Sequence, residues 1–320
     1  MAAYAILYRA DGSHCDVAPE ALARPERDDD LLWIDIDTDG AEVLQDVCAR
    51  LDLPADVLRH LSGLGSKPLL RRYGDFIVVH SLVVVPGGEL RFDETELGIA
   101  AGQNMVITLH QQPVAFIDAI RRREHGENRL GHLNARTFVA ALLDWQLDSY
   151  HAAVAEFECA VESLEEAVLD GRQSDCTREL VIMRRGASQL RRMLAPHRVI
   201  FSSLSRPDFQ PDDEPQLIDQ FQRLEAHFDR AMDAVENARE LVIGSFGLFS
   251  NQVALHTNDS MRLLTFATVV IGALAVIAGA LGMNFKAALF TSSWGFWVAI
   301  ATMAVVTALA IWWGRRKDWI

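Results

Sequence analysis

The sequence predicts an α+β domain, then a long coiled-coil-like helical hairpin and a stalk helix, and finally two transmembrane α-helices. Three observations lead to this fold class. Strand-like and helix-like segments alternate in the first third of the chain, apolar residues then recur in steps of three and four, and two charge-free runs close the chain. We therefore expect three domains, at residues 1–130, 131–262 and 263–320.

The first 110 residues have the pattern of an α/β domain. Runs rich in β-branched and aromatic residues predict strands at 3–12, 31–37 and 76–88. A fourth segment, ELGIAAGQNMVITLH, predicts a hairpin that turns at Gly102-Gln103-Asn104. Helices are expected at 41–53, 54–65 and 111–126.

Long helices are expected from about residue 132 onward. Two apolar series with helical spacing are separated by a turn at Gly171: Val154, Phe157, Val161, Leu164 and Val168, then Leu180, Met183, Ala187, Leu190 and Leu194. This spacing is typical of a coiled-coil-like antiparallel hairpin. Its outer face is acidic, which indicates either a solvated helix face or a surface that attracts cations.

A proline-rich break at 205–215 precedes the stalk helix, which Asp212 or Asp213 could cap. No further proline occurs before the membrane. We expect one helix that starts near Pro215 and continues into the first span, with about 65–70 residues and a length of about 100 Å.

The two charge-free runs, residues 263–283 and 294–313, are long enough to cross a membrane. Two buried helices of a soluble domain are the less favoured interpretation, because such helices rarely stay uncharged for so long. Arg262 precedes the first run and Arg315-Arg316-Lys317 follow the second, so the positive-inside rule places both termini in the cytoplasm. The start of the chain lacks the pattern of a signal peptide. We expect a multi-pass protein of the cell inner membrane, in contact with lipid.

Charge is distributed unevenly along the chain. The formal net charge is −14; residues 263–320 contribute +3, so residues 1–262 carry −17. An acidic body of this kind is a poor partner for nucleic acid and can attract cations.

The four cysteines are scattered and are interpreted as free thiols rather than as a disulfide framework or zinc site. The sequence contains no G-x-S-x-G nucleophile motif, no Walker A motif for ATP binding, no H-E-x-x-H zinc-protease motif and no dinucleotide-binding fingerprint. We therefore expect neither an enzyme nor an ATP-driven pump.

A stripe of small and polar residues follows one face of the stalk helix and the first span. Its members, in steps of three and four, are Gly244, Gly247, Asn251, Ala254, Asn258, Met261, Thr265, Thr268, Gly272, Ala275, Gly279 and Gly282. The stripe indicates either tight helix packing or the wall of a pore. Asn258 and Asn284 near its two ends favour a pore, as do Met261 and Leu264, which could form a hydrophobic gate at the inner mouth. Two helices cannot enclose a pathway, so a pore requires a cyclic homo-oligomer.

Several motifs resemble the CorA magnesium-transporter family (2-TM-GxN). Gly282-Met283-Asn284 ends the penultimate span, the stretch 258–265 resembles the family's N-x-x-M-K-x-L-T, and GIAAGQNMVITLH resembles its G-x-N-h-h-h-T-h element. Within the family, the stretch 190–198 is most similar to the ZntB zinc-transporter branch. The resemblance implies a homopentamer whose first span lines the pore. By position, Gly282, Met283 and Asn284 would form the outer selectivity ring, with Asn284 holding a hydrated metal ion. Asn258, Met261 and Leu264 would form the inner gate, and the wall would comprise Thr265, Thr268, Gly272, Ala275 and Gly279.

Three features depart from the family pattern or invite a further role. Lys286 follows the tripeptide and would repel cations at the mouth unless it points away. Gly272 replaces a bulkier pore residue, which suggests a wider or differently gated middle. Six acidic residues, Asp28, Asp29, Asp30, Asp35, Asp37 and Asp39, could bind regulatory cations, although a solvated loop and strand face is the favoured interpretation.

The sequence therefore predicts a homopentameric transporter or channel for hydrated divalent cations, Zn²⁺ or Mg²⁺ and possibly Co²⁺ or Ni²⁺. These ions are cargo, and no cofactor is expected. The absence of Cys, His, Asp and Glu from the stripe within the span disfavours direct ligation of bare zinc or copper there. A membrane-anchored metal sensor or scaffold that has lost transport is the alternative, suggested by Lys286.

Overall fold

The computed structural model describes residues 3–37, 41–63, 67–88, 90–123, 134–170, 176–206, 215–282 and 293–317. These residues divide into two compact units, Met1–Ser245 and Phe246–Ile320. The first unit is an α/β domain with long helices, and two apolar helices end the chain, so the expected fold class is confirmed. The finer division at residues 130 and 262 stays a prediction.

One mixed sheet forms the centre of the first unit. In the described part of the chain its seven strands lie in the order β2-β1-β3-β7-β6-β5-β4. Only β3 and β7 run parallel to each other; the other neighbours are antiparallel. The strands are β1 (Ala3–Tyr8), β2 (His14–Asp16), β3 (Leu31–Asp37), β4 (Leu69–Tyr73), β5 (Phe76–Pro86), β6 (Phe92–Ala101) and β7 (Met105–His110).

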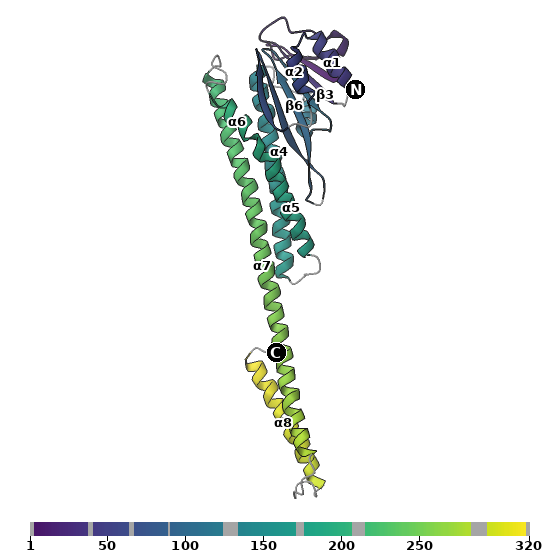
Figure 1. Cartoon of the computed structure of the whole chain (residues 1–320), viewed down its shortest axis with the longest axis vertical. Coiled ribbons are helices and arrows are strands. Elements are labelled where there is room, and N and C mark those ends of the chain that lie inside the picture. Colours follow the sequence, from purple (N-terminus) through teal and green to yellow (C-terminus); the bar gives the residue numbers. More distant parts are fainter. Residues whose placement is uncertain are drawn as a thin grey trace. The chain divides into compact units, whose positions relative to one another are not determined.

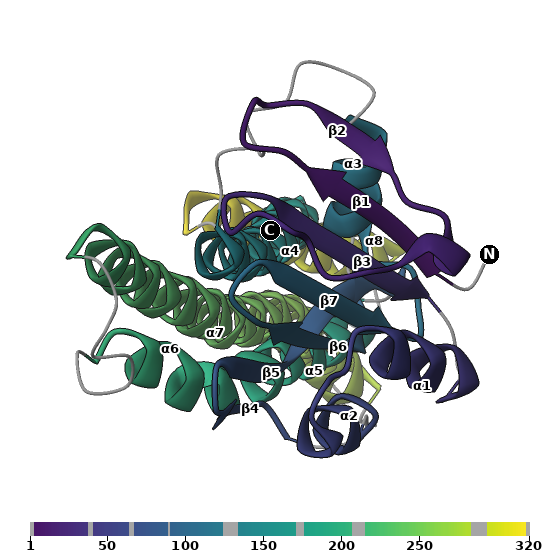
Figure 2. The same ribbon diagram turned by 90° about the horizontal axis from the view of Figure 1, so that it is seen from above.

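Helices cover both faces of this sheet (Figure 2). On one face, α1 (Ala41–Arg50) and α2 (Ala55–Leu61) pack on a core that includes Leu32, Ile34 and Ile36 of β3. On the other face, Trp33 of β3 meets Phe138 of α4 edge-on, with ring centroids 5.5 Å apart. Because alternate residues of β3 point to opposite covered faces, every residue from Leu31 to Ile36 is buried. This explains the nearly continuous burial of LLWIDID.

The predicted helical hairpin is confirmed as α4 (Ala135–Leu169) and α5 (Cys176–Leu194). All ten apolar positions of its two series are buried. The first unit also contains α3 (Ala115–Arg123) and α6 (Arg198–Leu204), together with two short 3-10 segments, η1 (Pro19–Ala21) and η3 (Ala195–His197). Figure 1 shows α4 and α5 side by side, with the upper part of α4 alongside the sheet.

The strands β2 and β4 were not predicted. Both are short, and the two exposed arginines of β4, Arg71 and Arg72, interrupt the apolar pattern that identifies a strand. The pairing of β4 with β5 ends at Leu69 and His80. Beyond that point the backbone of Leu82 is paired by side chains instead. Its N–H donates to His197 Nε2 (2.8 Å), and its carbonyl accepts from Gln146 Nε2 (2.7 Å) and the Tyr150 hydroxyl (3.0 Å).

The long stalk helix is confirmed as α7 (Pro215–Leu281), a single helix of 67 residues. Asp212 and Asp213, its predicted caps, lie outside the described residues. Within the first unit, one face of α7 is buried at Leu217, Phe221, Leu224, Phe228, Ala231, Val235, Ala238 and Val242. This spacing of three and four is the seam of a coiled-coil-like helix pair.

The second unit comprises the rest of α7 and α8 (Ser293–Arg316). Both helices are long and apolar enough to cross a membrane. The described part of the first predicted span falls within α7 up to Leu281, with Gly282 directly after the helix, and the second predicted span, 294–313, falls within α8. Large apolar side chains such as Leu264, Val276 and Trp297 are exposed, as is expected of surfaces that face lipid or another chain.

Candidate pore-lining face of α7

The two faces of α7 in the second unit differ in how they are covered. The half-buried positions of its membrane segment are Phe266, Val270, Leu274, Ile277 and Leu281. They share the bulky face, and α8 runs along this part of the helix (Figure 1). We conclude that α8 packs on the bulky face of α7.

The face of α8 that packs there consists mainly of glycine, alanine and threonine, together with Met303 and Val306. Its half-buried or buried positions are Gly295, Ala299, Met303, Val306, Thr307, Ala310 and Gly314. Small residues at this spacing let two membrane helices approach closely. Helix packing within the chain therefore uses the small face of α8 and leaves the small face of α7 unused.

The stripe of small and polar residues on α7 is exposed at every position from Gly247 to Gly282. A Cβ built on Gly247, Gly272 or Gly279 would meet no atom within 4 Å. Because α7 is continuous, the stretch from Asn258 to Gly282 rises about 36 Å, which is the thickness of a hydrocarbon core with a short margin. The stripe is thus an open face that crosses the whole membrane segment.

Polar atoms of the stripe are oriented by the helix itself. The hydroxyl of Thr268 donates to the Leu264 carbonyl at 2.8 Å. Because its proton is used inside the helix, the oxygen can present lone pairs to a hydrated cation. The side chain of Asn258 is exposed on the same face.

The predicted inner gate lies at the end of the stripe near Asn258. Met261 and Leu264 are 60% and 68% exposed, so most of each side chain is left uncovered within the chain. Arg262 forms an ion pair with Asp259 at 3.7 Å in the same turn. Of the predicted outer ring, the structure describes Gly282, whereas Met283, Asn284 and the neighbouring Lys286 lie outside the described residues. The roles of all these residues stay predictions.

The acidic residues of the first unit do not form one group. Asp30 accepts a hydrogen bond from the Ala10 backbone N–H at 3.2 Å, and Asp39 is not described. The solvated strand face expected for Asp35 is wrong, because its side chain is fully buried. Asp35 accepts hydrogen bonds from Thr108 and Arg121, and His110 Nε2 lies 3.3 Å away. Among the described residues, no group of three or more His, Cys, Asp or Glu is arranged to hold a metal ion.

Sequence reasoning missed a histidine cluster where α4 meets α7. His227 of α7 lies against Asp144 and Asp148 of α4, and its ring stacks on His151. The spacing of Asp144, Asp148 and His151 by four and three residues places them on one helix face. That spacing alone does not identify the partner, which is 83 residues further along the chain from Asp144.

An α/β domain, a helix that extends into a membrane span and a second apolar helix together define a class of membrane protein in which the soluble part comes first. A family model described as CorA-like Mg²⁺ transporter protein matches residues 28–316. The chain therefore belongs to the CorA-like Mg²⁺ transporter family, as the motifs predicted. Members of this family are ion transporters of membranes rather than enzymes.

The relatives of this chain include transporters that are named for different ions. The cobalt/magnesium transport protein CorA of Thermotoga maritima is 23% identical over 90% of this chain and 83% of its own length. The divalent cation transporter CmaX of Pseudomonas aeruginosa is 27% identical, covering 91% of this chain and 88% of its own. A zinc transport protein ZntB of Yersinia enterocolitica is 21% identical over 100% of this chain and 96% of its own.

The fold is shared with a solved structure along its whole length. The CorA magnesium transporter of Methanocaldococcus jannaschii superposes with a TM-score of 0.76 at 19% identity, covering 99% of this chain and 98% of that one. At this identity the likeness shows the fold alone. The assignment to the zinc branch within the family stays a prediction.

Proposed function

We propose that this chain is a homopentameric transporter or channel for divalent metal cations. Five copies of α7 would surround a central pathway, and five copies of α8 would form the outer ring against lipid. The observation that carries this proposal is that the two faces of α7 are covered differently. The bulky face packs against α8, and the stripe of small and polar residues stays exposed through the membrane segment. A pore wall needs such a face, because small residues leave room for a hydrated ion.

The chemistry of the stripe supports a hydrated divalent ion as cargo. From Met261 to Gly282 the stripe offers hydroxyl and backbone oxygens but no thiolate, imidazole or carboxylate, and the side-chain amides of Asn258 and Asn284 lie near its two ends. Oxygen ligands suit Mg²⁺, which keeps several waters when bound. Zn²⁺, Co²⁺ and Ni²⁺ could pass the same wall inside their hydration shells. Relatives named for magnesium, cobalt and zinc support this range of ions.

The outer end of the pathway would be a ring of Asn284 side chains, positioned by Gly282 and Met283. Five amide oxygens at one level could accept hydrogen bonds from the water around an ion and so select it by size and charge. At the inner end, Met261 and Leu264 would form a hydrophobic constriction that gates by dewetting. Asn258 would hydrate the ion just before this gate.

We further propose that the protein lies in the cell inner membrane with both termini in the cytoplasm. The support is the position of the basic residues: Arg262 precedes the first span, and Arg315 to Lys317 follow the second. In this topology the acidic first unit lies in the cytoplasm, where its negative charge raises the local cation concentration.

Flux in proteoliposomes tests the proposal. Purified protein should carry Mg²⁺, Zn²⁺, Co²⁺ or Ni²⁺ into vesicles. Asn284→Ala should abolish that flux or change which of these ions is carried. No flux of any of the four ions, with Asn284→Ala behaving as the wild type, would refute it. Metal binding and a conformational response without flux would instead support a membrane-anchored sensor. Lys286→Gln distinguishes the role of the basic residue, since flux should rise if Lys286 faces the mouth.

A further inference from the structure

His227 of α7 lies between two carboxylates of α4 in the first unit. Its Nδ1 is 2.7 Å from Asp144 Oδ1, and its Nε2 is 3.7 Å from Asp148 Oδ1. The histidine side chain is 15% exposed, whereas the two carboxylates are 52% and 60% exposed. The cluster is therefore anchored by a largely buried ring and open to solvent at its rim.

The hydrogen bond to Asp144 determines what the other ring nitrogen can do. A carboxylate only accepts, so Nδ1 must carry the proton that it donates to Asp144. In the neutral ring, Nε2 then carries a lone pair, and Asp148 Oδ1, which also only accepts, lies 3.7 Å from it. Either a proton on Nε2 or a metal ion bound by both atoms removes the repulsion between these two acceptors. The metal-bound form is the carboxylate–histidine–metal arrangement, in which an outer carboxylate orients the ring.

The separation of these two acceptors suits a shared metal ion. Two protein atoms bound to one tetrahedral ion at about 2.0–2.2 Å are about 3.4 Å apart. The observed 3.7 Å between Nε2 and Asp148 Oδ1 is close to that value. Small adjustments of exposed Asp148 would close the difference.

His151 supplies a third nitrogen next to this pair. It lies one turn after Asp148 on α4, and its ring stacks on that of His227 with centroids 5.1 Å apart and planes inclined by 13°. In the described structure these side chains do not yet converge on one point, so His151 must rotate about its side-chain bonds to complete the site.

We propose that His227, Asp148 and His151 bind one transition-metal ion of the Zn²⁺, Co²⁺ or Ni²⁺ class, with Asp144 orienting His227. Imidazole ligands suit these ions, whereas Mg²⁺ prefers oxygen alone. The ligands come from two helices, so the ion would fasten the cytoplasmic part of α7 to α4. The site lies apart from the stripe and does not depend on transport through it.

Cobalt absorption spectroscopy tests the site directly. Full-length protein, with any affinity tag removed and metals stripped, is titrated with Co²⁺ in detergent, and Zn²⁺ is then added to displace it. The wild type should develop the visible absorption of tetrahedral Co²⁺ bound to nitrogen and oxygen, with one ion per chain. Zn²⁺ should remove this absorption, whereas Mg²⁺ should not.

Three variants assign the signal to its ligands. His227→Asn keeps an amide N–H near the position of Nδ1 but removes the Nε2 ligand, and Asp148→Asn removes the carboxylate with little change in shape. Each should abolish the signal. Asp144→Asn removes only the orienting carboxylate, so we expect affinity to fall by about 10–100-fold. His14→Asn, at an exposed histidine of β2, is the matched control and should bind as the wild type does.

The outcome is separable from that of the transport proposal. Asn284→Ala should leave the cobalt signal intact, whatever its effect on flux. Zn²⁺ should also raise the thermal unfolding midpoint of the wild type and not that of His227→Asn. If His227→Asn and Asp148→Asn retain the tetrahedral signal and its affinity, or if the wild type shows no saturable binding, the proposed site does not exist.

Discussion

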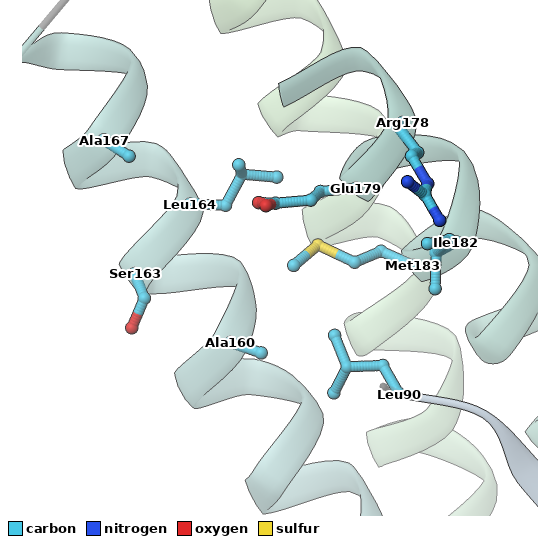
Figure 3. Close-up of a pocket in the computed structure, with 9 residues that line it drawn as sticks. All are labelled: Leu90, Ala160, Ser163, Leu164, Ala167, Arg178, Glu179, Ile182 and Met183. Atoms are coloured by element: carbon cyan, nitrogen blue, oxygen red, sulfur yellow. The ribbon is translucent and has the colours of Figure 1, made fainter. Parts of the chain in front are cut away.

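The carbonyl oxygen of Leu90 lies 2.7 Å from the position that a Cβ would occupy on Gly186. The tip of the β5–β6 hairpin thus touches α5 backbone to backbone. Leu90 has a φ of 57°, a left-handed conformation that is uncommon for leucine. Its side chain points toward Met183 of α5 in the groove between α4 and α5 (Figure 3). The contact therefore fastens the sheet to the helical hairpin.

Replacing Gly186 with alanine should loosen this contact. The new methyl group would overlap the Leu90 carbonyl and crowd the rings of Phe92 and Phe157, 3.4 and 3.5 Å away. Overpacking of this kind costs about 1–3 kcal/mol, which exceeds the helix propensity gained from alanine. The thermal unfolding midpoint should fall. Gly244→Ala, where a Cβ meets nothing within 4 Å in the chain, is the control and should not lower it.

The buried ring of His197 should make the first unit sensitive to acid. Burial lowers the pKa of His197 from 6.5 to about 4, and the neutral ring accepts the Leu82 N–H. Because the folded pKa lies below the unfolded one, the unfolded chain binds more protons between pH 4 and 6.5. Stability is therefore complete above about pH 6.5 and falls toward pH 4, by about 3 kcal/mol at most.

Denaturant unfolding at several pH values measures this slope. His197→Gln keeps an acceptor near the Leu82 N–H but removes the titrating group, so its stability should depend less on pH in this window. An unchanged slope in His197→Gln would show that other groups cause the acid sensitivity.

Asp35 and Arg121 should behave as a buried ion pair. Asp35 of β3 is fully buried, and the Arg121 side chain is 24% exposed. Arg121→Met leaves a buried carboxylate without its main partner, which costs about 3–5 kcal/mol. Asp35→Asn combined with Arg121→Met should recover much of that loss, because no unpaired charge remains. Losses that simply add in the double variant would argue against the pairing. The measurement is the free energy of unfolding of the wild type, the two single variants and the double variant.

Ion flux should be sensitive to a large side chain introduced at a glycine on the open face of α7, because that face would line the proposed pathway. Gly272→Leu would place a large side chain at a position where a Cβ now meets nothing. We expect ion flux in proteoliposomes to fall to the level of empty vesicles, with the oligomer intact. Val305→Leu, at an exposed position of α8 opposite the side that packs on α7, should conduct normally. Equal flux in both variants would mean that Gly272 does not face the pathway.

Much of the fold could be predicted because it depends on local pattern. A chain without proline from residue 216 to the membrane, with apolar steps of three and four, leads to one long helix, and α7 ends within two residues of the predicted span end. The strand β4 was missed because Arg71 and Arg72 hide its pattern. Asp35 was misjudged because alternation of apolar residues and aspartates resembles a half-exposed strand, whereas both faces of β3 are covered.

The sequence by itself determined the two apolar helices, the helical hairpin and the stripe on α7, because spacing along a helix dictates which residues share a face. Only the tertiary structure decided which face of α7 is covered: the stripe was equally consistent with close packing until α8 was seen to take the bulky side. The same holds for His227 and Asp148. Residues so distant along the chain meet because two apolar seams bring α4 and α7 together, and no local pattern encodes which polar groups then face each other.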